Sequence, residues 1–282
     1  MEDLKKAIRT GLSGYKAMTI QVCSLMWLRT IMNYQYKYGT SIPETIKILY
    51  SQGGIARFYK GLLPGLIQGP VSRFGDTFSN ALVMNLTQKM NLPIFVKTGF
   101  ASMTAGLVRV LLTPIDTIKT MSQVEGGNAW KILNDKIKEH GIMTLFSGAA
   151  ANGVVTLIGH YPWFVMHNYL NKYIPKYDSP LKNLLRNAGI GFCCSLVSDT
   201  SSNFLRVIKT ARQTSEKNIG YIEVINKIIE KDGIAGLFFR GLGIRIITNG
   251  IQGLMFNVMW KYFDGKNKIA SPVVKQIESQ NK

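Results

Sequence analysis

The chain has 282 residues, of which 46% are hydrophobic, and its 34 lysines and arginines outnumber its 16 aspartates and glutamates, for a formal net charge of +18. This composition is too apolar for a disordered basic tail and too basic for an ordinary cytosolic enzyme. A nucleic-acid binder would also be basic. The basic residues here are scattered along the whole length, however, without charge runs and without zinc-finger or RNP-type signatures, so we do not expect the chain to bind nucleic acid.

The sequence has no motif of a catalytic, metal or cofactor site. Cys23, Cys193 and Cys194 are odd in number and lack the spacing of a zinc site or a disulfide framework, so we expect reduced thiols. The histidines have no nucleophile in a motif context, and VEGGNAWK lacks the spacing of a phosphate-binding loop. The N-terminal stretch MEDLKKAIRTGLSGYK lacks the parts of a secretory signal. We expect neither an enzyme nor a cofactor or metal ion.

Long apolar segments and short amphipathic segments alternate along the chain. Residues 8–35 form the first apolar segment, PETIKILYSQGG is a short amphipathic piece, and residues 61–88 form the second apolar segment. This order of an apolar, an amphipathic and a second apolar segment recurs two more times. The apolar residues of the amphipathic pieces fall at helical spacing. The further apolar segments cover 94–122, 148–173, 181–212 and 241–264, and the further amphipathic pieces are NAWKILNDKIKEHGI and YIEVINKIIEKDGI.

Two landmarks indicate a threefold internal repeat. Near the end of the first apolar segment of each repeat stands a base followed by a threonine, at Arg29, Lys119 and Lys209. The second landmark is GGIARFYKG, HGIMTLFSG and DGIAGLFFRG, each of which ends in glycine just before the next apolar segment. Because both landmarks recur in the same order, we divide the chain into repeats. These cover 1–92, 93–178 and 179–265, and a polar C-terminal tail follows at 266–282.

The apolar segments are long enough to cross a bilayer, which takes about 20 helical residues. The mean hydropathy of +0.07 is modest for a membrane protein. This hydropathy fits a membrane protein if each helix has one polar face and these faces surround a water-filled cavity. Soluble helical repeats have shorter periods and need no apolar stretches of this length. The sequence therefore predicts an all-α membrane protein with six transmembrane helices in three pseudo-symmetric repeats, each with a short amphipathic helix.

One apolar segment contains LTPIDTIKT, with Pro114, Asp116 and Lys119 where hydrocarbon would disfavour all three. The sequence PIDTIK followed by Gln123, repeated at this spacing with the glycine-aromatic-base-glycine landmark, resembles the mitochondrial carrier family. The resemblance implies six helices around a pseudo-threefold axis, a central solute site, alternating access and exchange across the mitochondrial inner membrane. It also implies that the amphipathic helices face the matrix, that Pro114 kinks its helix, and that Asp116 and the bases close the matrix side.

The sequence departs from the family pattern in the first and third repeats, so it resembles a divergent member. Ser24 and Phe204 stand in the place of the proline, and Met26 and Arg206 in the place of the acid. We therefore expect an incomplete matrix gate with one acid. Its members are Arg29, Asp116, Lys119, Arg206 and Lys209, with Gln123 and Gln213 beside them. At the opposite side, the expected gate residues are Leu82, Asn85, His167, Asn168, Asn171, Met259, Trp260 and Phe263, which offer amide hydrogen bonds and apolar contact.

Helical geometry points to a solute site one level away from this gate. Seven residues are nearly two turns, so residues seven before positions 26, 116 and 206 face inward too, and these are Thr19, Arg109 and Asp199. We expect Arg109 to bind a phosphate or carboxylate, and a structural pair with Asp199 is the alternative. The resemblance implies further contacts on the even helices, with Arg73 and Arg245 near enough to add charge. These contacts are Gln68, Val155, Thr156, His160, Thr248 and Asn249, of which His160 could instead be a packed helix residue.

A basic cavity favours anionic solutes. Nucleotides are the first choice, because several inward bases suit several phosphate charges and Val155 with Thr156 leaves room for a base. The alternatives are a small carboxylate or inorganic phosphate, and a non-transporting membrane adaptor that keeps the carrier fold. We also expect a monomer that binds cardiolipin at the glycines opening the even helices, because these leave N–H groups for an anion. The lipid ligands would be Lys60, Gly61, Gly148, Arg240 and Gly241, with Ser147 weakening the middle site.

Overall fold

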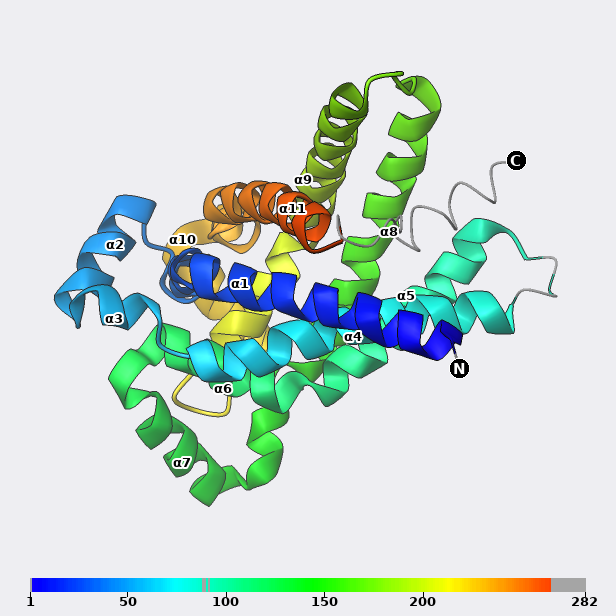
Figure 1. The fold of residues 1–282 in the computed structure, drawn as a ribbon. Coiled ribbons are helices and arrows are strands. Elements are labelled where there is room, and N and C mark those ends of the chain that lie inside the picture. Colours follow the sequence, from blue (N-terminus) through cyan, green and yellow to red (C-terminus); the bar gives the residue numbers. More distant parts are fainter. Residues whose placement is uncertain (1, 88–89, 91, 265–282) are drawn as a thin grey trace.

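The computed structural model describes residues 2–87, 90 and 92–264, and all the regular structure in this part of the chain is helical (Figure 1). The tail at 266–282 lies outside the described residues. The long helices are α1 (Glu2–Tyr38), α4 (Leu62–Leu86), α5 (Ile94–Leu111), α6 (Thr113–Glu125), α8 (Ala149–Tyr173), α9 (Pro180–Gln213) and α11 (Leu242–Asp264). Between them lie α2 (Ile42–Ser51), α3 (Gly54–Phe58), η1 (Gly126–Asn128), α7 (Ala129–His140), η2 (Ile142–Phe146) and α10 (Tyr221–Phe239).

The long helices form a closed ring in chain order. α1 packs against α4, α4 against α5, α5 against α8, α8 against α9, α9 against α11, and α11 against α1 again. Figure 1 shows α2, α3 and α10 at the end of α1 away from the N-terminus. We call this end of the ring, with α7, the short-helix end. A ring of this kind places one face of every long helix toward the interior.

Pro114 marks the break between α5 and α6. It lies in the first turn of α6, where its missing N–H would have no partner within the helix. The segments Val96–Leu111 and Thr113–His140 are bent by 63° at this break. The corresponding places in the other repeats carry Ser24 and Phe204, and there α1 and α9 run on as single helices. The presence or absence of the proline thus decides which helix is broken.

Each amphipathic helix packs its apolar face on one long segment. Leu49 of α2 joins a cluster with Leu28 and Ile31 of α1. Leu133 of α7 packs with Met121 of α6. Val224 and Ile228 of α10 pack with residues of α9, among them Val207 and Ile208. These three small cores fix the short helices at one end of the ring.

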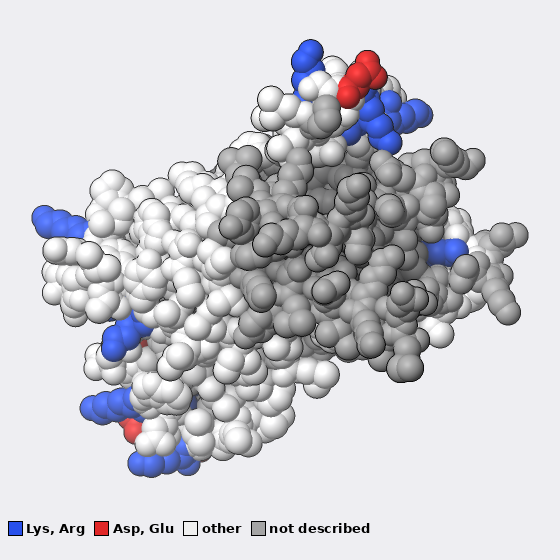
Figure 2. All heavy atoms as spheres, viewed as in Figure 1, with Lys and Arg blue, Asp and Glu red and all other residues white. Residues whose placement is uncertain are grey.

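The outer surface of the long helices is apolar. On α4, Leu63, Ile67, Phe74 and Phe78 lie on one helix face and are between 51% and 76% exposed, an arrangement expected of a surface in contact with lipid. By length and hydropathy, Ile142–Tyr173 and Tyr221–Gly253 qualify as membrane spans, and the bent α5–α6 segment joins them if it counts as one span. On the face in Figure 2, lysines and arginines gather over α7 and at the tip of the α8–α9 pair, and an isolated basic side chain projects beside α2.

Candidate functional site

A buried carboxylate links two segments of the ring at the short-helix end. Asp116 of α6 binds the Lys119 ammonium through Oδ1 at 2.7 Å and the Lys209 ammonium of α9 through Oδ2, and its side chain is 4% exposed. Gln213 Nε2 donates to the same Oδ2 at 3.4 Å. Asp116 and Lys119 meet because they are three residues apart on one helix face, whereas Lys209 crosses from another repeat. The single carboxylate thus pairs with two lysines and leaves this cluster with a net charge of +1.

Amide and hydroxyl groups complete the links between these segments. Asn33 of α1 donates from Nδ2 to Gln123 Oε1 of α6 at 2.6 Å. Gln213 of α9 donates to Thr117 Oγ1 of α6 at 3.1 Å. The hydroxyl of Tyr36 on α1 donates to Asn203 Oδ1 of α9 at 3.2 Å. Each pair of segments, α1 with α6, α6 with α9 and α1 with α9, is therefore joined at the short-helix end, which is closed.

Cations from the neighbouring repeat cover the carboxyl ends of the same segments. Arg57 donates from Nη1 to Gln123 O at 2.8 Å and from Nη2 to Val124 O at 2.6 Å. Lys136 Nζ of α7 donates to Ser215 O at 2.9 Å, just beyond α9, and Lys231 Nζ donates to Tyr38 O at 2.9 Å. Positive groups at helix carboxyl ends satisfy open carbonyls and complement the helix dipole. None of these three cations was among the expected site residues.

Two arginine–aspartate pairs lie further into the ring. Arg109 of α5 binds Asp76 of α4, with Nη2 2.6 Å from Oδ2. Arg245 of α11 binds Asp199 of α9, with Nε 2.7 Å from Oδ1, and Asn249 donates to the other oxygen of Asp199. The expected alternative pair of Arg109 with Asp199 is therefore not formed. Asp76 was not among the expected site residues, although it is the lone acidic residue in the apolar segment 61–88.

Positive charge exceeds negative charge among these inward groups. Arg29 interacts electrostatically with Arg245, Arg73 and Arg109. Arg206 interacts with Arg245, Arg109 and Lys209. In the described part of the ring, seven cationic side chains thus form one group with three carboxylates. The cations are Arg29, Arg73, Arg109, Lys119, Arg206, Lys209 and Arg245, and the carboxylates are Asp76, Asp116 and Asp199.

Comparison with known proteins identifies the chain's family. The family model for mitochondrial carrier protein matches residues 93–178 and 181–264. The chain belongs to the mitochondrial carrier family. The first 92 residues lie outside the matched ranges.

Three relatives illustrate the breadth of this family. The mitochondrial glycine transporter of Vanderwaltozyma polyspora is 26% identical over 50% of this chain, which covers 52% of that relative. The mitochondrial carrier-like protein L276 of Acanthamoeba polyphaga mimivirus is 25% identical over 56% of this chain, which covers 61% of it. The mitochondrial pyrimidine nucleotide transporter RIM2 of Saccharomyces cerevisiae is 21% identical over 80% of this chain, which covers 70% of it. The chain is thus a divergent carrier.

The remaining expected solute contacts of this carrier have different surroundings. Gln68 accepts from Lys119 Nζ at 3.1 Å and donates to Ser72 Oγ at 3.1 Å, so it touches the closed end. Thr248 is buried and donates to Ile244 O within its own helix. His160 is half-buried with Phe164 edge-on to its ring. Val155 and Thr156 are buried in α8, and Thr19 is half-buried on α1.

At the opposite end of the carrier, Arg186 of α9 donates hydrogen bonds to the C-terminal end of α8. It donates to Asn171 Oδ1 at 2.9 Å and to Ile174 O at 3.0 Å, and Asn171 also contacts His167. The contact of Asn171 with His167 lies within α8, whereas Arg186, which was not among the expected gate residues, joins α9 to α8. Leu82 and Asn168 are exposed. The side chains of Asn85, Met259, Trp260 and Phe263 lie outside the described part of the structure.

The expected lipid ligands differ in their surroundings. Lys60 is exposed beside Gly61. Arg240 is buried, and it pairs with Asp232 at 2.7 Å and donates to Lys37 O at 3.3 Å. The residue directly before each of α4, α8 and α11 is a glycine with a positive φ. These glycines are Gly61, Gly148 and Gly241.

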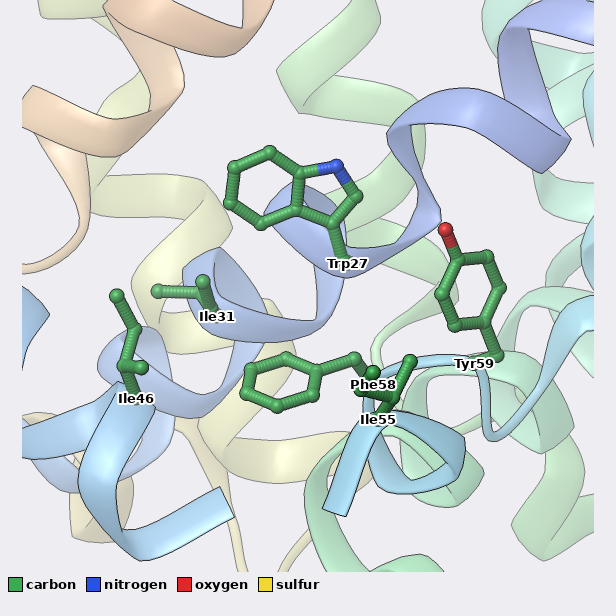
Figure 3. A pocket seen from close by; sticks show the side chains of 6 residues that line it. All are labelled: Trp27, Ile31, Ile46, Ile55, Phe58 and Tyr59. Atoms are coloured by element: carbon green, nitrogen blue, oxygen red, sulfur yellow. The ribbon is translucent and has the colours of Figure 1, made fainter. Parts of the chain in front are cut away.

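An apolar pocket of about 230 Å³ opens between α1, α2 and α3. Figure 3 shows Trp27 and Ile31 reaching it from α1, Ile46 from α2, and Phe58 with its neighbours from the α3 segment. The remaining lining residues are Ile55 and Tyr59. Because no lining residue carries a charge, this pocket does not suit an anionic solute.

Proposed function

We propose that this carrier exchanges anionic solutes, most favourably nucleotides, across the mitochondrial inner membrane by alternating access. The observation that carries the proposal is the surplus of four positive charges among the interacting inward side chains. A cluster of guanidinium groups between low-dielectric helix walls attracts anions and offers bidentate partners to phosphate and carboxylate.

The nucleotide preference rests on the number of cations and on similarity to a pyrimidine nucleotide transporter across most of the chain. Several phosphate charges match several separate arginines better than one carboxylate does. The similarity to a glycine transporter over half of the chain supports the alternative of a small carboxylate solute. Inorganic phosphate is the third candidate, since it needs the same guanidinium partners.

The mechanism that we propose uses the closed end as a matrix gate. Arg29, Asp116, Lys119, Arg206 and Lys209 would form it with Gln123 and Gln213, and Arg109, Arg245 and Asp199 would contact the solute. Residues 1–92, 93–178 and 179–265 would act as three repeats, with six membrane spans in a monomer. The contacts of Asp116 with two lysines support this assignment, because separation of the helices would break a desolvated ion pair.

A thermal-shift panel on the detergent-purified protein tests the solute class. A ligand that binds the folded state alone raises the melting temperature by linkage. We expect ADP and pyrimidine nucleotides to raise it more than succinate, glycine or inorganic phosphate at matched ionic strength. A larger shift with succinate or phosphate would favour the small-anion alternative. No shift with any of these solutes, together with no exchange in liposomes, would favour the adaptor with a carrier fold.

We also propose that cardiolipin phosphate groups bind at the start of the even helices. Lys60 is the exposed cation beside Gly61, and a helix start offers N–H groups to an anion. Because Arg240 pairs with Asp232, the site at Gly241 would need Arg240 to share its guanidinium. The site at Gly148, next to Ser147, would bind most weakly. Cardiolipin should raise the melting temperature more than phosphatidylcholine, and Lys60→Gln should reduce this difference; equal stabilisation by both lipids would contradict the proposal.

A further inference from the structure

Arg206 lies where the solute region meets the closed end. On α9 it follows Asp199 by seven residues and precedes Lys209 by three, so the three side chains share one face of the helix. Its electrostatic partners are Arg245, Asp199 and Arg109 toward the solute region and Lys209 toward the closed end. An ion moving from one region to the other would pass this guanidinium.

The Arg206 guanidinium is incompletely satisfied. Its Nη2 donates to the Ser202 hydroxyl at 3.3 Å, and its buried Nε has no hydrogen-bond partner among the described residues. The three inward carboxylates are bound by other cations: Asp76 by Arg109, Asp116 by the two lysines and Asp199 by Arg245. A buried donor without a partner is costly, and more so when its group is charged.

A glycine of α8 lies against the Arg206 guanidinium. Gly159 faces it, and a Cβ at that position would lie 3.6 Å from Arg206 Nη2 and 3.4 Å from Ser198 Oγ. Ser198 donates to Gly159 O at 2.6 Å. A glycine, two serine hydroxyls and the guanidinium therefore meet between α8 and α9. Both hydroxyls already donate to backbone carbonyls, so the guanidinium supplies the N–H groups and the positive charge that an anion would bind.

We propose that Arg206 binds an oxyanion group of the transported solute, a phosphate or a carboxylate, and that this anion supplies the counter-charge that the chain itself lacks next to the closed end. The proposal rests on the proposed function and extends it to a second position along the solute's path. The Nε–Nη edge of a guanidinium matches two oxygens of such a group. Closure of the matrix end is then most favourable with solute present, so binding and gate movement are coupled.

Binding to the full-length detergent-purified protein tests this role. The melting temperature would be measured with ADP, with inorganic phosphate and with succinate at constant ionic strength. Arg206→Gln removes the charge and keeps the approximate size, and Arg206→Glu adds a carboxylate of the chain's own. Lys182→Gln is the control, because Lys182 is an exposed cation near the other end of the same helix. Exchange of the best-binding anion in liposomes is the second readout.

We expect Arg206→Gln to weaken binding roughly tenfold or more relative to Lys182→Gln, as expected for losing a charge-assisted hydrogen bond. Arg206→Glu should raise the melting temperature without anion and abolish the anion-induced shift, because the new carboxylate pairs with the neighbouring cations. Unchanged affinity and exchange in Arg206→Gln would overturn the role of Arg206 and leave the proposed function standing. If the wild type neither binds nor exchanges any of the three anions, both proposals are overturned.

Discussion

The Lys209 ammonium of α9 binds the Asp116 carboxylate of α6, an ion pair that joins two repeats at the closed end of the ring. Lys119 binds the other carboxylate oxygen at 2.7 Å. One buried acid therefore pairs with two bases, and no second acid in the described residues takes part in this contact. Loss of the carboxylate would leave both lysines unpaired in a desolvated position.

Asp116→Asn should open this end of the protein. Breaking a buried pair by removing one partner costs about 3–5 kcal/mol, and this cost falls on the closed state. A cysteine in place of Thr120, which is 3% exposed, reports the change through its rate of maleimide labelling. The background must lack the native cysteines, because Cys23 and Cys193 are exposed. Labelling should be faster in Asp116→Asn than in the parent.

Two further variants control this experiment. Asp178→Asn changes the same side chain at an exposed position between α8 and α9, and it should leave labelling unchanged. Arg206→Glu places a carboxylate next to the surplus cations and should slow labelling. Equal rates in Asp116→Asn and the parent would mean that Asp116 does not hold the closed end.

Arg109→Ala should lose most of the exchange activity. The change removes one inward positive charge, and it also leaves the negative charge of Asp76 without the Arg109 partner. Both effects make the local potential less favourable for an anion. The double variant Asp76→Ala with Arg109→Ala removes both charges and should recover thermal stability but not exchange. Exchange at the normal rate in Arg109→Ala would show that Arg109 is no solute ligand, whatever its effect on stability.

Gly241→Ala should destabilise the protein, whereas Gly243→Ala should not. Gly241 has φ +65°, and a Cβ there would lie 2.7 Å from the ring of Tyr36 on α1. Gly243, two residues later in α11, has no neighbouring atom within 4 Å of an added Cβ. Alanine at Gly243 should stabilise by about 0.5–1 kcal/mol through helix propensity. Equal melting temperatures for the two variants would contradict the close approach of α11 to α1.

Lys136 should make stability depend on pH above neutrality. Burial, followed by the charges of Lys37 and Arg212, lowers the pKa of Lys136 from 10.5 to about 8, and α7 lies outside the predicted span 94–122. Between these pH values the unfolded chain holds a proton that the folded chain has released, so stability rises with pH. The melting temperature of the wild type should therefore rise between pH 8 and pH 10.5 relative to that of Lys136→Met. Lys131→Met, at an exposed position of the same helix, should keep the wild-type slope.

The sequence predicted the all-helical fold and the break at Pro114, because both follow from local chemistry. Apolar spacing reveals an amphipathic helix, and a proline ends a hydrogen-bond ladder wherever it occurs. The resemblance to the carrier family implied that Asp116 would pair with a base from another repeat, and Lys209 is such a base. The carboxylate that pairs with Arg109 was harder to predict from the sequence. Asp76 and Asp199 are both inward carboxylates, and the rotation of adjacent helices decides which of them Arg109 reaches. Arg57 and Lys136 were missed since their carbonyl partners belong to distant helix ends that only the folded ring brings near.

Counter-exchange in liposomes tests the central claim most directly. Purified protein would be reconstituted into vesicles loaded with unlabelled ADP or left empty, and uptake of radiolabelled ADP would be followed at fixed ionic strength. Succinate-loaded and phosphate-loaded vesicles, each given its own label, would run in parallel. The charge surplus in the ring predicts rapid uptake of an anion into vesicles that contain the same anion, with nucleotide fastest, and loss of this uptake in Arg109→Ala. Uptake no faster than in protein-free vesicles for every anion tested would contradict a transporter of anions.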